Sequence, residues 1–263
     1  MTAPADASDT LVTGPVRPHP TLAGRYADDA VRPQYVRTLF DETAIEYDAT
    51  AALLAFGSGP WYRRHTLTLA GLAPGMTIVD VAAGTGQVTQ AAAAIVGETG
   101  TVYAVEPSAG MLVQARLKLP ARVMLVQGEA EALPLPDDTA DFVSMGYAVR
   151  HVSDLVTAFA EYRRILKPGG TAMIMEIGPA QGRLTRAALG FWISRAVPAM
   201  HAVFGRGAGR YGRAVTLMGY YRDTLDGCVA PSVIEGALRQ AGFTDVKCSL
   251  SLGLFREYTG RKA

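Results

Sequence analysis

The chain has 263 residues, of which 49% are hydrophobic and 19% charged, and its formal net charge is +1 at pH 7. This length suffices for one sizeable α/β core with additions to it. A net charge so close to zero argues against a nucleic-acid partner held by broad attraction to phosphates.

The two cysteines, Cys228 and Cys248, lack the paired spacing of metal ligands. We expect free thiols in a reducing compartment and no bound metal. The N-terminus has no apolar targeting segment, and no stretch is long enough to span a bilayer. These features favour a soluble, cytoplasmic protein.

Residues 1–30 are rich in Ala, Pro, Thr and Asp, which predicts a poorly ordered arm. Apolar and aromatic residues then recur at helical spacing over 33–54, and a second helical pattern covers 61–72. We expect these two helices to cap the core that follows.

The next hundred or so residues alternate between short apolar strands and helices, as a parallel, doubly wound sheet requires. Ser108 and Ser153 are expected to cap two of the helices, and the KPGG sequence at 167–170 predicts a turn. The expected strands are 76–81, 101–106, 122–127, 141–149 and 171–178, and the expected helices are 86–96, 108–118 and 153–166.

After the fifth strand the sequence predicts an inserted helical lid. An amphipathic helix at 183–204 should be kinked by Pro198. A glycine-rich loop follows and carries Arg206, Arg210 and Arg213. One interpretation is a lid packed over the core, and the other is a basic amphipathic surface that admits an apolar substrate or contacts a membrane.

The chain ends with a predicted helix at 231–241, which Gly242 should terminate, and two strands at 246–252 and 254–262. A tight turn at Gly253 would join these strands into a hairpin that closes one edge of the sheet.

Together these elements predict a single domain with an α/β, Rossmann-like fold: a seven-stranded, mostly parallel sheet whose last strand is antiparallel. The expected parts after the N-terminal arm are the cap helices (31–74), a nucleotide-binding core (75–178), the lid (179–230) and the C-terminal helix and hairpin (231–263), which make up one domain over 31–263.

The segment Met76–Gly86 ends the first expected strand in a small-residue turn before a helix. Gly84 and Gly86 let the backbone approach a ligand, and the free N–H groups of the first helical turn favour negative charge. Glu106 lies 22 residues after Gly84, at the end of the second strand. An acid there can accept hydrogen bonds from both hydroxyls of a ribose, so the pattern predicts a nucleotide-like ligand.

Two residues favour S-adenosylmethionine (SAM) over a nicotinamide dinucleotide. A dinucleotide fingerprint wants a third small residue where Thr89 stands. Asp80, at the mouth of the first strand, would lie badly beside a pyrophosphate but well beside the cationic amino-acid end of SAM. A NAD-linked reductase and a structural turn without a ligand are the alternatives.

Several further motifs follow in chain order. They are FDETAIEYD (40–48), VDVAAGTGQ (79–87), VEPSAGML (105–112), QGEAEALPLPDDTAD (127–141), GYAVRHVSD (146–154), YRRILKPGG (162–170), MEIG (175–178) and AGFTDVK near the end. Together they resemble the class I SAM-dependent methyltransferases, and more closely the UbiE-type C-methyltransferases of ubiquinone and menaquinone biosynthesis. The glycine turn and KPGG are common to many methyltransferases, whereas the first and fifth of these motifs are more particular to this group.

The resemblance implies a set of cofactor-binding residues. They are Asp80, Gly84, Thr85 and Gly86 for the methionine end of SAM, Glu106 for its ribose, Glu129 and Ala130 for its adenine, and Gly146 on the fourth strand near the cofactor. Arg150-His151 stands where quinone methyltransferases carry Arg-Asn, which puts a quinone acceptor in question.

Arg150, His151 and Tyr47 are the candidates for catalysis. Arg150 would stabilise a phenolate or enolate of the acceptor. His151, with an ordinary pKa near 6.5, would take the proton directly or through a water. Tyr47 would hydrogen-bond that water or an oxygen of the substrate. For His151 a purely structural role is the alternative.

The expected function is methyl transfer from SAM to a small, apolar, aromatic or polyketide-like acceptor. Carbon methylation of a quinone precursor or of a secondary metabolite is favoured. The alternatives are O- or N-methylation in natural-product tailoring, and a SAM-binding protein with a cyclase or regulatory role. A homodimer and peripheral contact with a membrane are further hypotheses.

Overall fold

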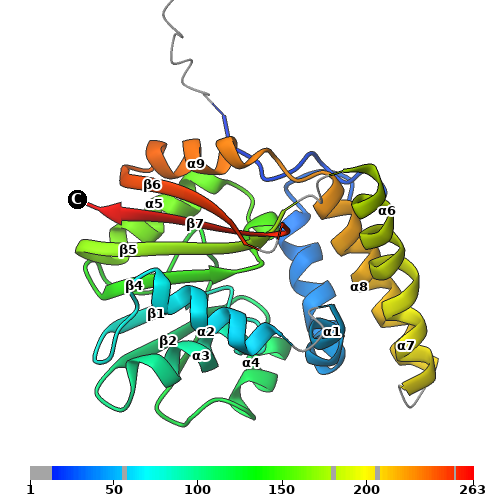
Figure 1. Ribbon diagram of the computed structural model, residues 1–263, viewed down its shortest axis with the longest axis horizontal. Helices are drawn as coiled ribbons and strands as arrows, with labels where there is room; N and C mark the ends of the chain where they lie inside the picture. Colours follow the sequence, from blue (N-terminus) through cyan, green and yellow to red (C-terminus); the bar gives the residue numbers. More distant parts are fainter. Residues whose placement is uncertain (1–13, 55–57, 179–181, 205–207, 252) are drawn as a thin grey trace, which may run out of the picture.

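The computed structural model describes residues 14–54, 58–178, 182–204, 208–251 and 253–263. Its centre is a seven-stranded sheet with the strand order β3-β2-β1-β4-β5-β7-β6 (Figure 1). The pairs from β3 to β5 are parallel, and β7 is antiparallel to both β5 and β6. The predicted Rossmann-like fold with an antiparallel last strand is therefore confirmed.

The strands are β1 (Thr77–Val81), β2 (Thr101–Glu106), β3 (Met124–Gln127), β4 (Ala140–Gly146), β5 (Leu166–Ile177), β6 (Phe243–Ser251) and β7 (Phe255–Lys262). The α-helices are α1 (Arg32–Leu54), α2 (Gly59–Leu69), α3 (Gln87–Val96), α4 (Ala109–Arg116), α5 (Leu155–Ile165), α6 (Arg183–Phe191), α7 (Val197–Phe204), α8 (Ala208–Asp226) and α9 (Pro231–Gln240). A 3₁₀ turn, η1 (Val149–His151), and a π-helical turn, η2 (Trp192–Ala196), complete the set.

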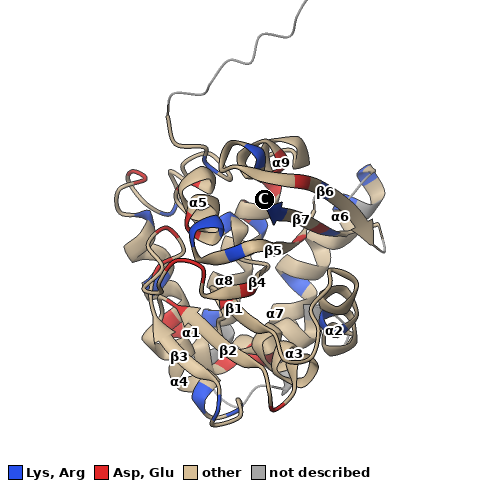
Figure 2. Cartoon of the chain, turned by 90° about the vertical axis from the view of Figure 1, so that its left-hand side faces the viewer, with Lys and Arg blue, Asp and Glu red and all other residues tan. Residues whose placement is uncertain are grey.

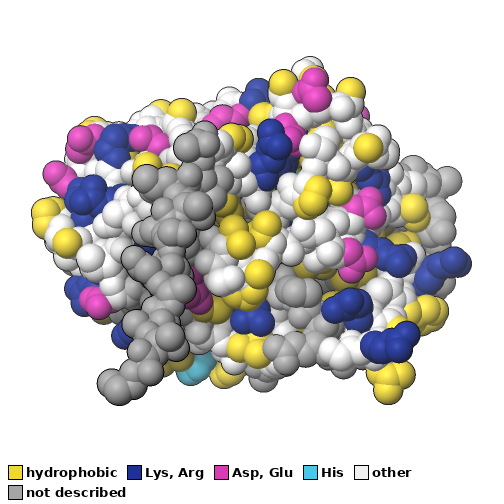
Figure 3. Space-filling model, turned by 90° about the horizontal axis from the view of Figure 1, so that it is seen from above, with side chains coloured by type: hydrophobic (Ala, Val, Ile, Leu, Met, Phe, Trp, Pro, Cys, Tyr) yellow, Lys and Arg dark blue, Asp and Glu magenta, His cyan; other side chains and the backbone are white. Residues whose placement is uncertain are grey.

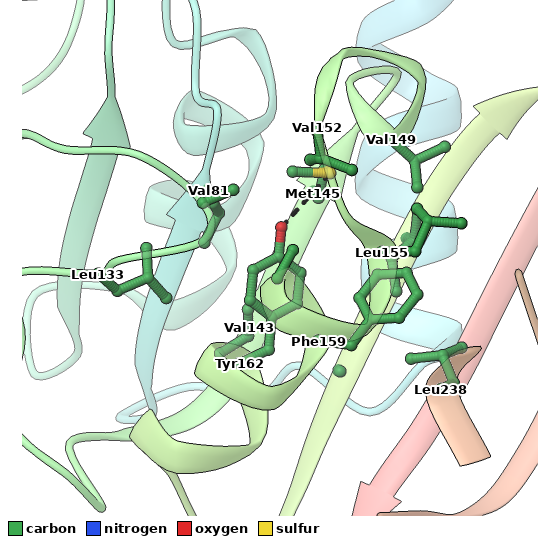
Figure 4. Close-up of a cluster of buried hydrophobic side chains, with 14 of the residues drawn as sticks. Val81, Leu133, Val143, Met145, Val149, Val152, Leu155, Phe159, Tyr162 and Leu238 are labelled. Atoms are coloured by element: carbon green, nitrogen blue, oxygen red, sulfur yellow. Dashed lines mark hydrogen bonds between the residues drawn. The ribbon is translucent and has the colours of Figure 1, made fainter. Parts of the chain in front are cut away.

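Two hydrophobic clusters hold the helices on the sheet. In one, α5 packs on β5, and α9 packs on α5 and β6, with Tyr162 and Phe159 of α5 fully buried (Figure 4). The hydroxyl of Tyr162 lies 3.4 Å from the sulfur of Met145, so this polar group has a partner inside the apolar layer. In the other cluster, α2, α3 and α4 contribute residues such as Leu67 and Ala92. Helices cover both faces of the sheet. The apolar residues of β1, which are Ile78, Val79 and Val81, are therefore all buried, although they point to both faces; Asp80 between them is buried as well.

A third cluster lies beyond the carboxyl ends of the strands. There α1, η2, α7 and α8 pack together through Leu39, Ile193, Val197 and Leu217. Figure 1 shows this group at one end of the molecule, with α6 and α7 outermost and α8 between them and α1. The segment predicted as a lid therefore packs with α1 in a hydrophobic cluster that is separate from the two clusters on the sheet.

Several element ends differ from the sequence expectation. The cap of α5 is Asp154, whose carboxylate accepts a hydrogen bond from the N–H of Val156 at 3.2 Å, and not Ser153. The fourth strand stops at Gly146, and Val149 lies in η1. The KPGG sequence is part of β5, which pairs with β7 as well as β4. By contrast, Ser108 caps α4 as predicted and accepts from the N–H of Met111 at 3.1 Å.

Two longer segments also differ. The expected glycine-rich loop with Arg210 and Arg213 is the first part of α8; Arg206 lies outside the described residues. Residues 14–30 were expected to belong to a poorly ordered arm, but they lie against the domain, with His19 and Tyr26 buried. Arg25 of this segment pairs with Asp223 of α8 at 2.7 Å. Residues 1–13 lie outside the described part of the chain.

Candidate active site

The turn between β1 and α3 depends on two glycines in left-handed conformation. Gly84 has φ +56° and Gly86, the residue before α3, has φ +86°. A Cβ atom on Gly86 would lie 2.7 Å from Cδ1 of Leu119, whereas one on Gly84 would meet nothing within 4 Å. Gly86 therefore combines a backbone requirement with close packing, and Gly84 has the backbone requirement alone.

Glu106 braces this turn from the end of β2. Its Oε2 accepts a hydrogen bond from the N–H of Gly84 at 2.8 Å, and its Oε1 accepts from the N–H of Ser108 at 2.9 Å. Burial raises the pKa of Glu106 to about 7 against the opposing effect of these two hydrogen bonds. Each carboxylate oxygen still has a lone pair for a ligand hydroxyl.

Asp80 lies beneath the turn and is fully buried. Its two oxygens accept hydrogen bonds from the hydroxyls of Thr89, at 2.6 Å, and Ser144, at 2.7 Å. Burial raises the pKa of Asp80 to about 6, and the two hydroxyls oppose that rise. Thr89, singled out in the sequence only for not being small, thus ties α3 to β1.

Helix α1 is fastened across the turn by two carboxylates. Asp48 accepts hydrogen bonds from the hydroxyl of Thr85 and from Nε2 of Gln87, the latter at 3.0 Å, and pairs with Lys118. About two helical turns earlier, Asp41 accepts a hydrogen bond from the Ser108 hydroxyl at 2.6 Å. The FDETAIEYD motif is therefore a clamp that joins α1 to the first turns of α3 and α4.

A cavity, here called the turn cavity, lies between α1 and the ends of β1, β2 and β4. Five of the predicted site residues line it: Tyr47, Gly84, Glu106, Gly146 and His151. Sequence reasoning missed others that line it, among them Val36, Phe40 and Met111. Two of its lining residues, Ala82 and Tyr147, have φ values of +53° and +61° without being glycine. Such strained backbone is concentrated at functional sites.

The other predicted cofactor residues lie around this cavity without lining it. Asp80, Thr85 and Gly86 support the turn from below and from the side of α1, as described above. Glu129 is partly exposed and pairs with Arg37 of α1, and its neighbour Ala130 is buried.

A larger cavity, here called the lid cavity, adjoins the first. Tyr47 and Tyr147 line both cavities, so these two rings stand at the junction. The lid cavity is lined by Tyr47, Ala51, Ser58, Gly59, Tyr62, Arg63, Tyr147, Arg150, Ile177, Leu189, Ile193, Tyr221, Leu225, Leu254 and Phe255. None of these lining residues is an acid, and most present carbon to the interior.

Arg150 is held in this wall by neighbouring groups. Its Nε lies 3.1 Å from Oε1 of Glu176, and both side chains are almost fully buried. A second nitrogen donates to the hydroxyl of Thr224 at 3.1 Å, and the guanidinium lies 5.4 Å from the ring centre of Tyr221. The positive charge at this wall is thus already matched by one carboxylate.

Arg63, on the inward face of α2, has no such partner. It is 8% exposed, its Nε has no hydrogen-bond acceptor, and no carboxylate among the described residues pairs with it. Its guanidinium lies 5.6 Å from the ring centre of Tyr147. A buried cation without a counter-ion is costly, so an anion supplied by a ligand would stabilise it. Arg63 could have been recognised in the sequence as a basic residue on the side of α2 that also carries Tyr62 and Thr66, both of which are buried.

His151 is partly buried beside the turn cavity. Its Nδ1 lies 3.0 Å from the hydroxyl of Tyr220, and its Nε2 has no partner among the described residues. Burial, followed by the charges of Arg150 and Arg32, lowers the pKa of His151 well below its usual value. The imidazole is therefore neutral at pH 7, and the structure brings it to the turn cavity while Arg150 lines the lid cavity.

Among the described residues, no group of three or more potential metal ligands occurs and no helix is long and apolar enough to cross a membrane.

Similar folds occur in SAM-dependent methyltransferases of known structure. A putative S-adenosyl-L-methionine-dependent methyltransferase from Methanococcus maripaludis matches with a TM-score of 0.58 at 22% identity, over 85% of this chain and 94% of that one. A SAM-dependent methyltransferase from Aquifex aeolicus matches with a TM-score of 0.55 at 20% identity, over 76% and 89%. The fold is that of the class I SAM-dependent methyltransferases.

The chain belongs to the ubiE/COQ5 methyltransferase family, whose family model matches residues 29–262. It is 34% identical to a demethylmenaquinone methyltransferase from Symbiobacterium thermophilum, over 87% of this chain and 93% of the relative. It is 33% identical to a ubiquinone/menaquinone biosynthesis C-methyltransferase from Shewanella sp. (strain ANA-3), over 67% and 72%. The protein is a methyltransferase, and its methyl donor is SAM.

Proposed function

We propose that the protein transfers a methyl group from SAM to a ring carbon of an apolar acceptor that carries an ionisable hydroxyl. A quinol precursor is one such acceptor. Two relatives of the protein are named as a C-methyltransferase of ubiquinone and menaquinone biosynthesis and as a demethylmenaquinone methyltransferase. A hydroxylated aromatic or polyketide-like metabolite is the other. The observation that carries this proposal is the acid-free lid cavity, which adjoins the turn cavity at Tyr47 and Tyr147.

The turn cavity offers the contacts that SAM needs. Glu106 would accept hydrogen bonds from the ribose hydroxyls, and the N–H groups at the start of α3 lie beside Gly84 and Gly86. The sulfonium would then lie near the junction of the cavities, between Tyr47 and Tyr147.

The lid cavity suits an acceptor that is flat, apolar and acidic at one oxygen. Methyl transfer is an in-line displacement, so the protein must hold the nucleophilic carbon about 3–3.5 Å from the methyl group in a dry space. A ring carbon is a better nucleophile when a neighbouring hydroxyl is ionised. Arg63 and Arg150 would favour that ionised form, with Arg63 the stronger candidate because no carboxylate balances it.

The direct test uses purified protein, methyl-labelled SAM and a panel of demethylated quinols, phenols and polyketides. Mass spectrometry follows the label and S-adenosylhomocysteine together. Label on a ring carbon of any hydroxylated acceptor supports the proposal, and its identity separates quinone from secondary metabolism. Label only on oxygen or nitrogen would replace it with a tailoring O- or N-methyltransferase.

A variant of Arg63 tests the role of the buried cation. Arg63→Leu should raise the KM for the acceptor roughly 10–100-fold, because a charge-assisted hydrogen bond is lost. Its exposed neighbour Arg64 does not line the lid cavity, so Arg64→Leu is the matched control and should leave the KM unchanged. An unchanged acceptor KM with weaker SAM binding would instead assign Arg63 to the carboxylate of SAM.

A further inference from the structure

Charge is unevenly divided along this chain. The 46 residues from 177 to 222 contain seven arginines and no Lys, Asp or Glu. Subtracting those seven from the 25 Lys and Arg of the chain leaves 18, against 24 Asp and Glu. The rest of the protein is therefore acidic, and the small net charge conceals a strongly basic lid. Figure 2 shows acidic and basic residues interspersed along the elements of the end that carries the sheet.

The outer side of α6 presents these charges together with large apolar side chains. Leu184 is 88% exposed and Phe191 66% exposed, and they lie seven residues apart on one face of the helical run. Arg183, Arg186 and Arg195 belong to the same helical run and are also exposed. Seen from above, blue basic and yellow apolar side chains lie together at this end of the molecule (Figure 3).

These three arginines form no ion pair within the described part of the chain. Arg213 and Arg222 of α8 pair with Glu46 and Asp226, but Arg183, Arg186 and Arg195 have no carboxylate partner among the described residues. Soluble proteins seldom leave residues as large as leucine and phenylalanine this exposed beside unpaired cations without a use for the surface.

We propose that the outer face of α6 and η2, formed by Leu184 and Phe191 with Arg183, Arg186 and Arg195, binds the surface of an anionic lipid bilayer. An amphipathic helix with a basic rim lies in the plane of such a surface, with its apolar side chains at the acyl boundary. A nucleic acid would match the arginines but would leave the two apolar side chains in water. A lipid surface satisfies both.

The inner side of the same helical run lines the lid cavity, so binding to a bilayer would bring that cavity close to the membrane. Leu189 and Ile193 line the lid cavity, so one short segment separates the cavity from the proposed lipid-facing surface. An apolar molecule dissolved in the bilayer would then be offered to the cavity without crossing water. The binding itself needs neither SAM nor an acceptor, so it stands or falls independently of the proposed reaction.

The test is co-sedimentation of the full chain with vesicles. We expect binding to vesicles of phosphatidylcholine mixed with phosphatidylglycerol, weakened by added salt, and little binding to phosphatidylcholine alone. Each arginine near an anionic surface strengthens binding about fivefold, so Arg183→Gln/Arg186→Gln/Arg195→Gln should weaken it roughly a hundredfold. Leu184→Ser/Phe191→Ser should also weaken it, and this loss should persist at high salt.

A matched triple variant separates the surface from net charge. Arg116, Arg239 and Lys247 are exposed on other elements, and Arg116→Gln/Arg239→Gln/Lys247→Gln removes the same charge. It should keep most of the vesicle binding. Equal loss in the two triple variants would overturn the proposal, as would an absence of binding to anionic vesicles. Unchanged SAM affinity in every variant checks that each remains folded.

Discussion

At the scale of single residues, Glu106 is predicted to make SAM binding depend on pH. Its pKa of about 7 in the free protein lies above the ordinary carboxyl value of 4.5, because it is buried. If the two ribose hydroxyls of SAM donate to the ionised form, as proposed above, binding SAM should release a proton. The dissociation constant for SAM should therefore fall by up to about tenfold per unit as the pH rises towards 7, and level off above it.

Isothermal titration between pH 5.5 and 8.5 measures this dependence. Glu106→Gln should weaken SAM binding at pH 8 and remove the pH dependence, whereas Glu98→Gln, which changes an exposed acid, should preserve it. The same raised pKa means that the free protein loses stability as the pH rises from about 4.5 through 7, since the folded state binds the extra proton. A pH-independent SAM affinity in the unmodified protein would exclude this coupling.

His151 carries a separate prediction. Its pKa is depressed, so it is neutral at pH 7 and its unpartnered Nε2 can accept a proton through water. We expect His151→Ala to lower the methylation rate more than the affinity for SAM, as measured by single-turnover kinetics and titration. Equal losses in the two quantities would assign His151 to shaping the turn cavity alone.

At the scale of elements, the turn between β1 and α3 distinguishes two glycines of one motif. Gly86→Ala should lower the free energy of unfolding by about 1–3 kcal/mol more than Gly84→Ala does, because only the first places a methyl group against Leu119. Denaturant unfolding of the two variants measures the difference. Adding Leu119→Ala should recover part of the loss for Gly86→Ala; similar costs at both glycines would show that backbone conformation alone decides.

The same elements show what the sequence can predict. The strands were located because buried apolar runs between glycine turns leave few alternatives, and Ser108 was recognised as a cap because it immediately precedes its helix. The start of α8 was mistaken for a loop because Gly209 and Gly212 suggested one, whereas packing of Leu217 and Tyr220 against α1 holds the helix. Tertiary contact overrode local propensity there.

The site was predictable in part for a related reason. Gly84 and Glu106 were located because their spacing along the chain fixes their meeting at the strand ends. The clamp from Asp48 to Thr85 and the unpaired Arg63 were missed, since both depend on how separate helices pack above the sheet. Neither contact follows from spacing within one element.

At the scale of the whole molecule, the third hydrophobic cluster should open independently of the sheet. The lid helices pack on one another and on α1 through this cluster, and the two clusters on the sheet are separate from it. Hydrogen exchange should therefore show lower opening free energies for amides of α6, α7 and α8 than for those of β1, β4 and β5. Adding SAM should slow exchange in α1, which Asp41 and Asp48 tie to the cofactor turn. A uniform opening free energy across lid and sheet would contradict this division.

Because the third hydrophobic cluster is separate from the two on the sheet, the lid can change in evolution independently of the nucleotide-binding core. The lid is encoded as one uninterrupted stretch between β5 and α9. It contributes Leu189, Ile193, Tyr221 and Leu225 to the wall of the lid cavity, the proposed acceptor site, and none of the residues of the glycine turn. Sequence changes within this stretch can thus alter which acceptor fits the lid cavity while the residues proposed to bind SAM stay the same. Lineages that share the donor site are free to diversify in what they methylate.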